Sequence, residues 1–461
     1  MATSFDIAVV GAGFSGLALL AALQRLGYGR RIALIGTSSE FGSGYAYSTG
    51  AGNYLLNSRA DRMGLHSDNP GGFADWLGLK GISRAGFAAR LVYGAYLQAE
   101  LQRLRASLGQ QLESLPTPVV AATRARGWQL TLGDGRRVAC RQLVLACGPL
   151  PSVATIGVDR SALAHRRYIC DPLRADALTR IPKRSRIVLL GSGLTMVDSV
   201  LGLLDNGHAG PLLAVSRHGL LPLPHVLSDS SGCDFQLPEK RNSTRSVLRA
   251  LRQAAAAGGD WRALMDSLRD QLPDLWRAST TSDRRRFLRH VAPIWSIHRH
   301  RLPHRNWERL QEAIEAGQLE VRAARVLRVS AGPRGLRVNL RPRGEMTEQQ
   351  VACAAVLQAT GFSGRIANCG NPLLTSLHQA GWLGGDSFHL GIATARNGSV
   401  RSAAGTASPG LFALGALARA EAWDVTAAPE LRLAAGQLAE RLAAAASKAD
   451  PATATSSKIS E

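Results

Sequence analysis

Apolar residues fall into the same arrangement at two places in the chain. Residues 6–10 form a continuous apolar run, residues 15–26 have apolar positions at helical spacing, and a second apolar run, RRIALIG, follows at once. This pattern predicts a buried strand, a helix and a second strand, which form a βαβ unit with a parallel pair of strands. A second unit of this kind begins with RIVLLGSGLTMVD at residue 186 and ends with GPLLAVSRHG at residues 210–219. The chain is therefore predicted to be an α/β protein whose parallel sheets are covered by helices.

The remaining segments alternate between helical and strand-like patterns. Residues 87–108 predict one long helix, and WQLTLGDG and RRVACRQLVLACG predict two strands joined by an Asp-Gly turn. Helical spacing extends from residue 244 to residue 317, with helix starts near Thr244, Asp260, Ser282 and His304. Strand patterns return in LEVRAARVLRVSAG, GLRVNLRP and QVACAAVLQATG, and a last helix is predicted over residues 428–446.

Length and composition are typical of a soluble protein with more than one domain. The chain has 461 residues, of which 45% are hydrophobic and 19% charged, so about two or three domains are expected. Glycines interrupt the apolar run from Ile7 to Leu23, and no basic segment precedes it, so neither secretion nor membrane insertion is expected. The six cysteines show no CxxC spacing, which indicates a reduced, cytoplasmic compartment.

The net charge of +21 admits two classes of ligand. A strongly basic protein binds either nucleic acids and membrane surfaces or small anionic ligands. The arginines are spread along the chain, and no basic block interleaved with aromatic residues occurs. We therefore expect a small anionic substrate, and neither a nucleic acid nor a membrane as partner.

The first glycine turn follows the first predicted strand. In Gly11-Ala-Gly13-Phe14-Ser15-Gly16, the first glycine permits a tight turn, the second lets a pyrophosphate approach the backbone, and the third lets helix and strand pack closely. The helix amides and the positive end of the helix dipole then bind the phosphates. The acidic residue expected after the second strand is replaced by Gly36, so the ribose hydroxyls are expected to bind Thr37, Ser38 or Glu40.

The second glycine turn has Gly191 and Gly193 but Met196 at the third position. The helix that begins with Leu194 and Thr195 should again bind a pyrophosphate, with a wider spacing between helix and strand. Ser216 and Arg217 follow about 25 residues after Gly191, at the end of the second strand of this unit. A hydroxyl and an arginine there fit the 2′-phosphate of NADP, whereas a solvated strand end in an arginine-rich protein is the simpler alternative. NADH and NADPH both remain open as donors.

Two turns of this kind predict two dinucleotides, FAD on the first unit and NAD(P)H on the second. VLACG, VLQATG and LFALG resemble the strand ends that surround FAD in two-dinucleotide flavoproteins, and they assign Gly148, Thr360, Gly361 and Gly415 to the FAD site. We predict two Rossmann-like domains, with the NAD(P)H domain inserted into a discontinuous FAD domain. The predicted segments are residues 1–155 for the first part of the FAD domain, 156–318 for the insert, 319–446 for the second part and 447–461 for a disordered tail.

The electron acceptor after the flavin is predicted by elimination. No cysteine pair occurs near the first unit, because the first cysteine is Cys140. His298, His300 and His304 alternate with arginines whose charge repels a metal ion, so no metal site is expected. Dioxygen is then the simplest acceptor, and a reduced flavin can form a hydroperoxide that transfers an oxygen atom.

Several segments together resemble a known family. They are FGSGYAYSTGAGNYLLNSRADRMGLHSDNPGGFADWL, FAARLVYGAY, GSGLTMVD, SRHGLLPLPH, WSIHRHR and WDVTAAPELR. The chain resembles, over about residues 5–445, the FAD/NAD(P)-binding family that includes a bacterial FAD-dependent urate hydroxylase and amino-acid N-monooxygenases that make nitrosuccinate from aspartate. Two residues depart from that pattern. Gly36 stands where the family more often has an acidic residue, and Asp424 stands where a glutamate is commoner.

The resemblance implies a flavin monooxygenase, and overall similarity favours urate as substrate. In that interpretation C5 of urate attacks the flavin hydroperoxide to give 5-hydroxyisourate. The alternatives are N-oxygenation of an amino acid such as aspartate, an NAD(P)H oxidase or reductase without oxygen transfer, and a redox sensor without catalysis. The oligomeric state is left open.

Candidate residues near the flavin come from the segment LLNSRADRM. Asn57 and Met63 lie in a part that resembles a flavin-facing loop, and Arg59 is a candidate for holding an anionic substrate. His225 is a candidate for moving a proton near neutral pH, although a lone histidine is more often structural. Arg299 and Arg301 are further candidates for binding an anion, as an alternative to a solvated role.

Overall fold

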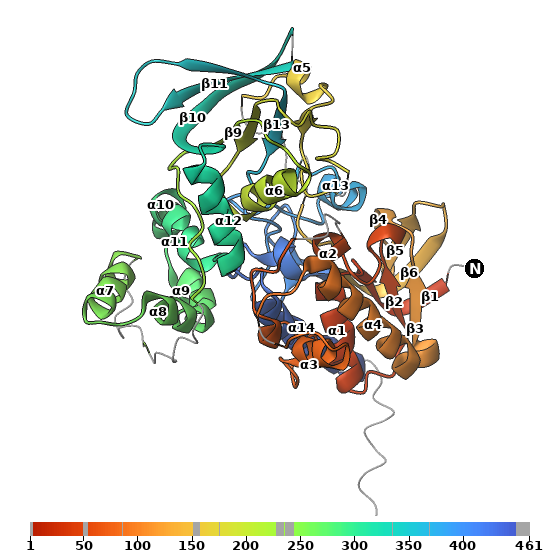
Figure 1. Cartoon of the computed structure of the whole chain (residues 1–461). Helices are drawn as coiled ribbons and strands as arrows, with labels where there is room; N and C mark the ends of the chain where they lie inside the picture. The colour runs from red at the N-terminus through yellow and green to blue at the C-terminus, as the bar shows by residue number, and fades with distance from the viewer. Residues whose placement is uncertain are drawn as a thin grey trace, which may run out of the picture. The chain divides into compact units, whose positions relative to one another are not determined.

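The computed structural model describes residues 3–48, 54–84, 86–150, 157–174, 176–226, 235, 244–333, 335–367 and 369–448 (Figure 1). The chain divides into two compact units. The first unit comprises Met1–Ser48, Ser58–Leu150 and Gly364–Glu461, and the second comprises Thr49–Asn57 and Pro151–Ser363. No helix among the described residues is long and apolar enough to cross a membrane.

The first unit is built on an eight-stranded sheet with the order β14-β15-β6-β1-β2-β3, to which β5 and β4 are added beside β6. The strands β15, β6, β1, β2 and β3 are parallel, so their carboxyl ends meet at one edge. Their bounds are β1 (Thr3–Val10), β2 (Ile32–Ile35), β3 (Leu112–Leu115), β4 (Val119–Arg124), β5 (Trp128–Leu132), β6 (Arg137–Leu145), β14 (Ser399–Arg401) and β15 (Ala407–Ala413).

Helices cover this sheet, and α1 packs against α4 and α14. The residues of α1 are buried from Phe14 to Leu23, because this helix lies between the sheet and the other helices. The bounds in this unit are α1 (Phe14–Arg25), α2 (Tyr45–Ser48), α3 (Gly72–Leu79), α4 (Arg90–Leu108), α13 (Pro372–Gln379), α14 (Ala428–Lys448), η1 (Ser38–Glu40), η2 (Ala60–Arg62), η3 (Gly109–Gln111) and η6 (Gly415–Ala418).

The second unit contains a seven-stranded sheet with the order β12-β11-β10-β9-β8-β13-β7. The strands β10, β9, β8, β13 and β7 run parallel to one another. β11 runs antiparallel to β10, and β12 runs antiparallel to β11. Their bounds are β7 (Tyr168–Ile169), β8 (Ile187–Leu190), β9 (Leu212–Ser216), β10 (Leu319–Gly332), β11 (Gly335–Pro342), β12 (Gln349–Cys353) and β13 (Ala355–Gln358).

The helical region of this unit forms a small core of its own around Met265, Leu268 and Trp295. Asp260 caps α8 by accepting a hydrogen bond from the Arg262 amide at 3.0 Å, so the predicted start there is confirmed. The helices are α5 (Arg160–Leu163), α6 (Leu194–Asp205), α7 (Thr244–Ala256), α8 (Trp261–Ser267), η4 (Arg269–Gln271), α9 (Leu272–Ala278), α10 (Thr281–Arg286), the π-helical turn η5 (Phe287–Val291), α11 (Ala292–Arg299) and α12 (His304–Glu315).

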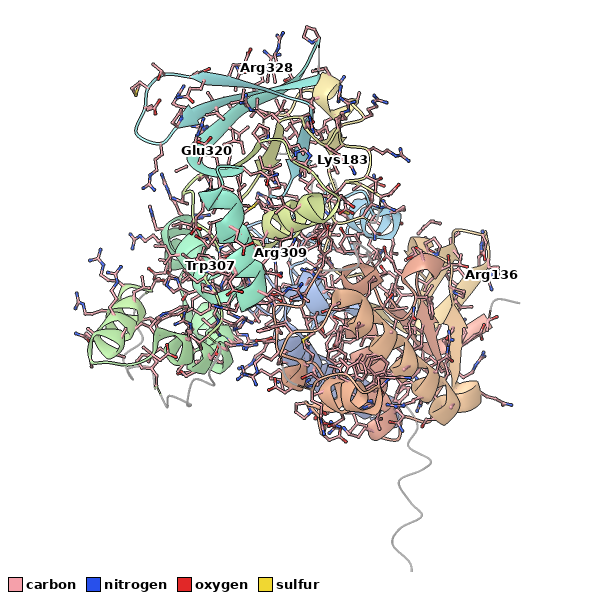
Figure 2. The ribbon with its side chains drawn as sticks, viewed as in Figure 1. Arg136, Lys183, Trp307, Arg309, Glu320 and Arg328 are labelled. Carbon is pink, nitrogen blue, oxygen red and sulfur yellow. The ribbon has the colours of Figure 1, made fainter. Side chains whose placement is uncertain are left out.

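Arginines lie beside carboxylates in each unit, and Figure 2 labels Arg136, Arg309 and Arg328 among them. In the first unit Arg136 lies 2.8 Å from Asp134, and in the second unit Arg328 lies 2.7 Å from Asp159. Arg309 of α12 donates a hydrogen bond of 2.5 Å to Asp205 at the end of α6, which ties these two helices together. Exposed pairs of this kind contribute about 0–1 kcal/mol each, so they position surface side chains more than they stabilise the fold.

The predicted fold class is confirmed, because two parallel-rich sheets each carry a strand, a glycine turn and a helix. The predicted end of the insert at residue 318 is wrong, since β10 pairs with β9 and β13 pairs with β8. The second unit therefore extends to Ser363. The predicted strands are present in the structure. A sequence pattern does not show, however, which neighbour a strand pairs with. The last helix continues to Lys448, and the predicted disordered tail lies from residue 449 outside the described residues.

Candidate functional site

The first glycine turn joins β1 to α1 at the carboxyl edge of the first sheet. Gly11 has a φ of +120°, and a Cβ atom there would lie 2.0 Å from the carbonyl oxygen of Ala146. A Cβ atom on Gly16 would lie 2.0 Å from the carbonyl oxygen of Gly11, so helix and turn are in direct backbone contact. No side chain caps α1, whose N-cap is Gly13. The first amides of α1 are therefore able to bind an anion such as a pyrophosphate.

The end of β2 lies beside this turn. Gly36 follows β2, and a Cβ atom there would lie only 3.1 Å from the Cβ atom of Ala12 in the turn. The exposed Thr37 and Ser38 and the half-buried Glu40 come next, in and before η1. The side chains predicted to bind ribose thus occupy the carboxyl end of the strand next to the turn, and their role stays a prediction.

The ends of β6 and β15 complete the same edge. Gly148 has a φ of +73° and nothing within 4 Å of a Cβ position, so the backbone there is open. A Cβ atom on Gly415 would lie 2.7 Å from Ser15 Oγ in the glycine turn. Burial raises the pKa of the neighbouring Cys147 thiol to about 12, which keeps it protonated and unreactive at neutral pH. The edge is suited to binding a dinucleotide and not to thiol chemistry.

The segment from Arg59 to Leu65 is held by side chains of α4 and α14. Tyr93 Oη donates to the carbonyl oxygen of Met63 at 2.8 Å, and Arg432 Nη1 donates to that of Gly64 at 2.5 Å. Met63 is buried, and the Nε atom of Arg59 lies 3.4 Å from Asp61. The sequence analysis singled out Met63 and Arg59 but not Tyr93, because the bond from Tyr93 to Met63 depends on how α4 packs.

The second glycine turn joins β8 to α6 in the second unit. Gly191 has a φ of +116°, and a Cβ atom there would lie 2.2 Å from the carbonyl oxygen of Ala359. Gly193 is the uncapped N-cap of α6, with nothing within 4 Å of a Cβ position. Leu194 and Thr195 form the first turn of the helix. Met196 is fully buried in the core, so the third position serves packing and not phosphate access.

A basic cluster lies at the carboxyl end of β9. Arg217 is exposed, and Arg217 and Arg343 both lower the pKa of His218, whose largest shift comes from burial. Arg343 follows β11, and its amide donates to the carbonyl oxygen of Ala323, the residue of β10 that pairs with Ser216. The sequence missed Arg343, which lies more than 120 residues after Arg217 and reaches it through the pairing of three strands.

Ser216 has a structural role in this loop. Its Oγ atom accepts a hydrogen bond from the Gly219 amide at 3.0 Å and lies 2.8 Å from Ser192 Oγ. The Ser192 hydroxyl donates to the carbonyl oxygen of Leu220 at 2.6 Å. These contacts with Ser192 and Gly219 make Ser216 a residue that shapes the loop after β9.

Thr360 and Gly361 lie elsewhere than predicted. They follow β13, which pairs with β8 in the second sheet, and the Thr360 amide lies 3.3 Å from a Cβ position on Gly191. They belong to the edge of the second glycine turn and not to the edge formed by β1 and β6. Asn57 likewise falls in the second unit, whereas Met63 falls in the first. The similar endings of buried parallel strands explain this misassignment.

His225 is half-buried beside charged residues of the helical region. Its Nε2 atom donates to the carbonyl oxygen of Asn57 at 3.1 Å, and burial, reinforced by Arg301, lowers its pKa to about 4. The buried Arg301 itself donates to Asp266 at 2.6 Å, and Arg299 is also buried. The prediction that His225 moves a proton near neutral pH is therefore wrong, because the ring is neutral there. Among the described residues no group of His, Cys, Asp and Glu is arranged to hold a metal ion.

Comparison with protein families agrees with the first of these two edges. Residues 8–150 match the FAD-NAD(P)-binding family. These residues contain the first glycine turn, so the chain has an FAD/NAD(P)-binding domain there. No curated protein matches the chain.

Solved structures match almost the whole chain. The ornithine hydroxylase from Pseudomonas aeruginosa has a TM-score of 0.65 at 16% identity, covering 96% of this chain and 99% of its own. The ornithine N-hydroxylase from Kutzneria sp. 744, described with reduced FAD, NADP+ and L-ornithine, has a TM-score of 0.64 at 16% identity, covering 96% and 100%. The L-lysine 6-monooxygenase from Pseudomonas syringae has a TM-score of 0.64 at 18% identity, covering 96% and 99%. At these identities the likeness establishes the fold, which is that of a two-domain, two-dinucleotide flavoprotein.

Proposed function

We propose that this protein is an FAD-dependent, NAD(P)H-driven monooxygenase that oxygenates the amino group of a small amino acid. The observation that carries the proposal is the match of 96% of the chain to ornithine and lysine hydroxylases. Urate hydroxylation, expected from the family resemblance, receives no support from these comparisons. N-oxygenation, the alternative, takes its place as the leading function.

The first unit is the proposed FAD site. Cβ atoms at Gly11 and Gly16 would collide with backbone atoms, so the turn requires glycine at both positions. The turn that these glycines form leaves the first amides of α1 open, which fits a pyrophosphate. Phe14, Ser15 and Gly13 would line it, with Thr37, Ser38 or Glu40 at the ribose and Met63, Gly148 and Gly415 around the rest of the cofactor. When bound, FAD accepts a hydride from the nicotinamide and, once reduced, activates dioxygen.

The second unit is the proposed donor site, and NADPH is the proposed donor. Gly191, Gly193, Leu194 and Thr195 would bind the pyrophosphate, with Thr360 and Gly361 beside the turn. The Arg343 amide donates to Ala323, which pairs with Ser216 beside Arg217, so both arginines lie at this end of the sheet. A phosphate with about two negative charges is the ligand that such a pair of guanidinium groups prefers.

The residues of the chain would contribute positioning more than proton transfer. The thiol of Cys147 is held protonated by burial, and His225 is neutral at neutral pH, so neither serves as an acid near pH 7. Arg59 remains the candidate for the carboxylate of the substrate, and its pair with Asp61 would have to open to free the guanidinium. A fixed anion site orients the amino group of the substrate without taking part in the chemistry.

The test is turnover by the FAD-loaded protein with NADPH or NADH in air. L-Aspartate, L-ornithine, L-lysine and urate are supplied separately, and NAD(P)H oxidation, peroxide and hydroxylamine or nitro products are followed together. We expect one amino acid to stimulate NADPH oxidation with little peroxide and with formation of an N-oxygenated product. Loss of urate matched to NADPH oxidation would contradict the proposal, and so would oxidation that gives only peroxide with every substrate.

A further inference from the structure

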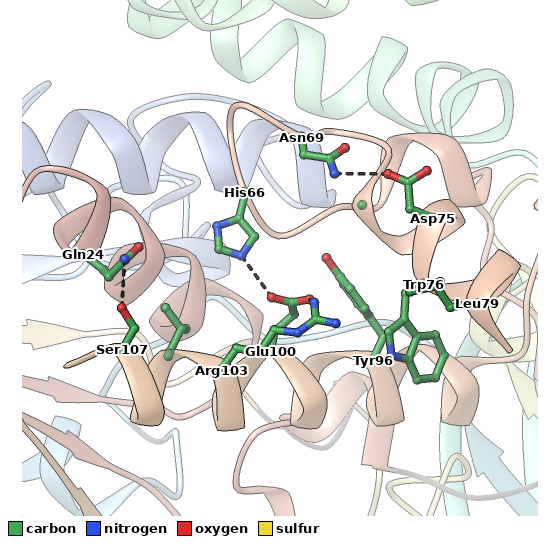
Figure 3. A pocket seen from close by; sticks show the side chains of 12 residues that line it. Gln24, His66, Asn69, Asp75, Trp76, Leu79, Tyr96, Glu100, Arg103 and Ser107 are labelled. Carbon is green, nitrogen blue, oxygen red and sulfur yellow. Dashed lines mark hydrogen bonds and ion pairs between the residues drawn. The ribbon is translucent and has the colours of Figure 1, made fainter. Parts of the chain in front are cut away.

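A cavity of about 300 Å³ lies in the first unit (Figure 3). Its walls come from α1, α3, α4 and the loop that carries His66 and Asn69, and no residue of the first glycine turn lines it. None of the residues predicted to bind a cofactor or substrate lines it. The mechanism proposed above therefore leaves this cavity unused.

A buried carboxylate lies in its wall. The side chain of Glu100 is 4% exposed, and its Oε2 atom lies 3.0 Å from His66 Nε2. Its Oε1 atom accepts from Arg103 Nη1 at 2.5 Å, yet the Arg103 side chain is 61% exposed. Glu100 is fixed by burial, whereas its positive partner reaches it from solvent. An incoming cation can therefore replace Arg103 at low cost.

A second carboxylate and an aromatic ring add to this preference. Asp75 also lines the cavity, where it accepts from Asn69 Nδ2 at 3.1 Å and pairs with Arg84. Trp76 lines the cavity beside it (Figure 3). Leu104 is among the apolar lining residues, and Arg103 and His66 line the cavity together with the two carboxylates. A carboxylate oxygen accepts more than one hydrogen bond, so Glu100 retains acceptor capacity after binding His66.

We propose that this cavity is a binding site for a small organic amine. Its ammonium group binds Glu100 in place of Arg103, and its methylene chain lies along the apolar side chain of Leu104, one helical turn after Glu100.

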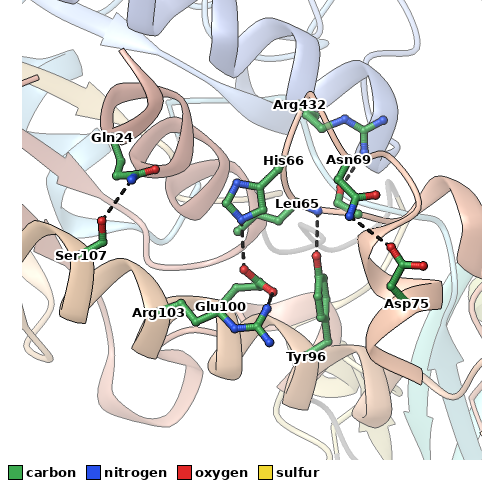
Figure 4. Close-up of polar contacts among 11 residues, drawn as sticks. Gln24, Leu65, His66, Asn69, Asp75, Tyr96, Glu100, Arg103, Ser107 and Arg432 are labelled. Carbon is green, nitrogen blue, oxygen red and sulfur yellow. Dashed lines mark hydrogen bonds and ion pairs between the residues drawn. The ribbon is translucent and has the colours of Figure 1, made fainter. Parts of the chain in front are cut away.

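The same helix connects this cavity to the segment around Met63 (Figure 4). Tyr96, one helical turn before Glu100, accepts a hydrogen bond from the Leu65 amide at 3.0 Å. Tyr93, a further turn away on the same face, binds the carbonyl oxygen of Met63. An amine bound at Glu100 shifts the segment from Met63 to Leu65 through α4, and so changes the surroundings of the flavin. This consequence for the flavin rests on the proposed function, whereas the binding itself does not.

The test is calorimetric titration of the FAD-loaded protein with putrescine. We expect saturable binding with a dissociation constant of about 1 mM or tighter. Glu100→Gln should weaken it at least about tenfold, because a charge-assisted hydrogen bond is lost. Glu113→Gln, an exposed carboxylate of the same unit outside the cavity, is the matched control and should leave binding within about twofold.

Arg103→Gln keeps the test decisive if Glu100→Gln fails to fold, because Arg103 is largely exposed. Removal of the competing guanidinium should tighten putrescine binding severalfold. Absence of binding to the wild-type protein at about 10 mM putrescine, or unchanged binding in both variants, would overturn the proposal. The flavin absorbance spectrum is recorded in the same titration. Binding without a spectral change overturns the link to the flavin alone, and NADPH turnover with an amino acid but no putrescine binding leaves the proposed function standing.

Discussion

The two glycine turns are alike at their first two positions and differ at the third. At Gly11 and at Gly191 a positive φ and a carbonyl oxygen at about 2 Å from a Cβ position exclude any side chain. At the third position Gly16 is in contact with Gly11, whereas Met196 fills the core of the second unit. The first position thus follows from the geometry of the turn, and at the second position a Cβ atom would lie 3.0 Å from Gly44 at Gly13 but meet nothing within 4 Å at Gly193. The third position depends on what fills the space between helix and sheet.

The two units also differ after their second strands. A Cβ atom on Gly36 would lie only 3.1 Å from the Cβ atom of Ala12, and the polar groups come later, from Thr37 to Glu40. In the second unit Arg217 and Arg343 gather at the corresponding strand end. On the proposed assignment, the turns would bind what the two dinucleotides share, and the strand ends would separate one dinucleotide from the other.

The strongest test of the comparison replaces the first glycine of each turn. Gly11→Ala and Gly191→Ala should each destabilise their unit by about 3 kcal/mol or more, through strain at positive φ and overlap with a carbonyl oxygen. Gly11→Ala should abolish FAD binding, whereas Gly191→Ala should retain FAD but lose reduction by NADPH. Absorbance of the purified protein and anaerobic flavin reduction measure the two effects.

Gly27→Ala is the control for the glycine substitutions. Gly27 also has a positive φ, of +66°, but nothing lies within 4 Å of its Cβ position. Its substitution should therefore cost only about 1 kcal/mol and leave both cofactors bound. Equal effects of Gly11→Ala and Gly191→Ala on FAD content would contradict the assignment of the two turns to different dinucleotides.

The second unit should lose stability in acid because of His225. The pKa of this ring is about 4 in the folded protein and about 6.5 in the unfolded chain, so the unfolded state binds the proton first as the pH falls. The free energy of unfolding that depends on the neutral His225 ring is fully present above pH 6.5. It falls by about 3 kcal/mol between pH 6.5 and 4. Urea unfolding at pH 7 and pH 4.5 measures it, and His225→Gln should flatten this difference.

His290→Gln, an exposed histidine of the same unit, is the control for the acid test. The free energy of unfolding of this variant should stay within about 0.5 kcal/mol of the wild-type value at both pH values. An unaltered acid loss in His225→Gln would show that another group causes the pH dependence.

The smallest expected effect concerns the choice of donor. Arg217→Ala and Arg343→Ala should each raise KM for NADPH about tenfold and leave KM for NADH unchanged, because each removes one charge from the proposed 2′-phosphate site. Steady-state kinetics with both donors measure the effect. Arg328→Ala, an exposed arginine of the same unit paired with Asp159, should change neither constant. Parallel changes with both donors would exclude a role in recognition of the 2′-phosphate.

The sequence by itself determined the two βαβ units, the two glycine turns and the helical region after residue 244. These features are local, because apolar spacing, glycine positions and helix caps act within a few residues of one another. The α/β class, the first glycine turn and its likeness to FAD/NAD(P)-binding proteins could be predicted for that reason.

Only the tertiary structure decided which strands are neighbours and which side chains meet. The pairing of β13 with β8 moved Thr360 and Gly361 to the second unit, and the pairing of β9, β10 and β11 brought Arg343 to Arg217. Burial changed His225 from an expected proton carrier to a neutral ring, and the packing of α4 created the cavity around Glu100. These outcomes depend on contacts between distant segments. The free energy of such contacts comes from burial and strand pairing, and the local pattern of residues does not show which segments will meet.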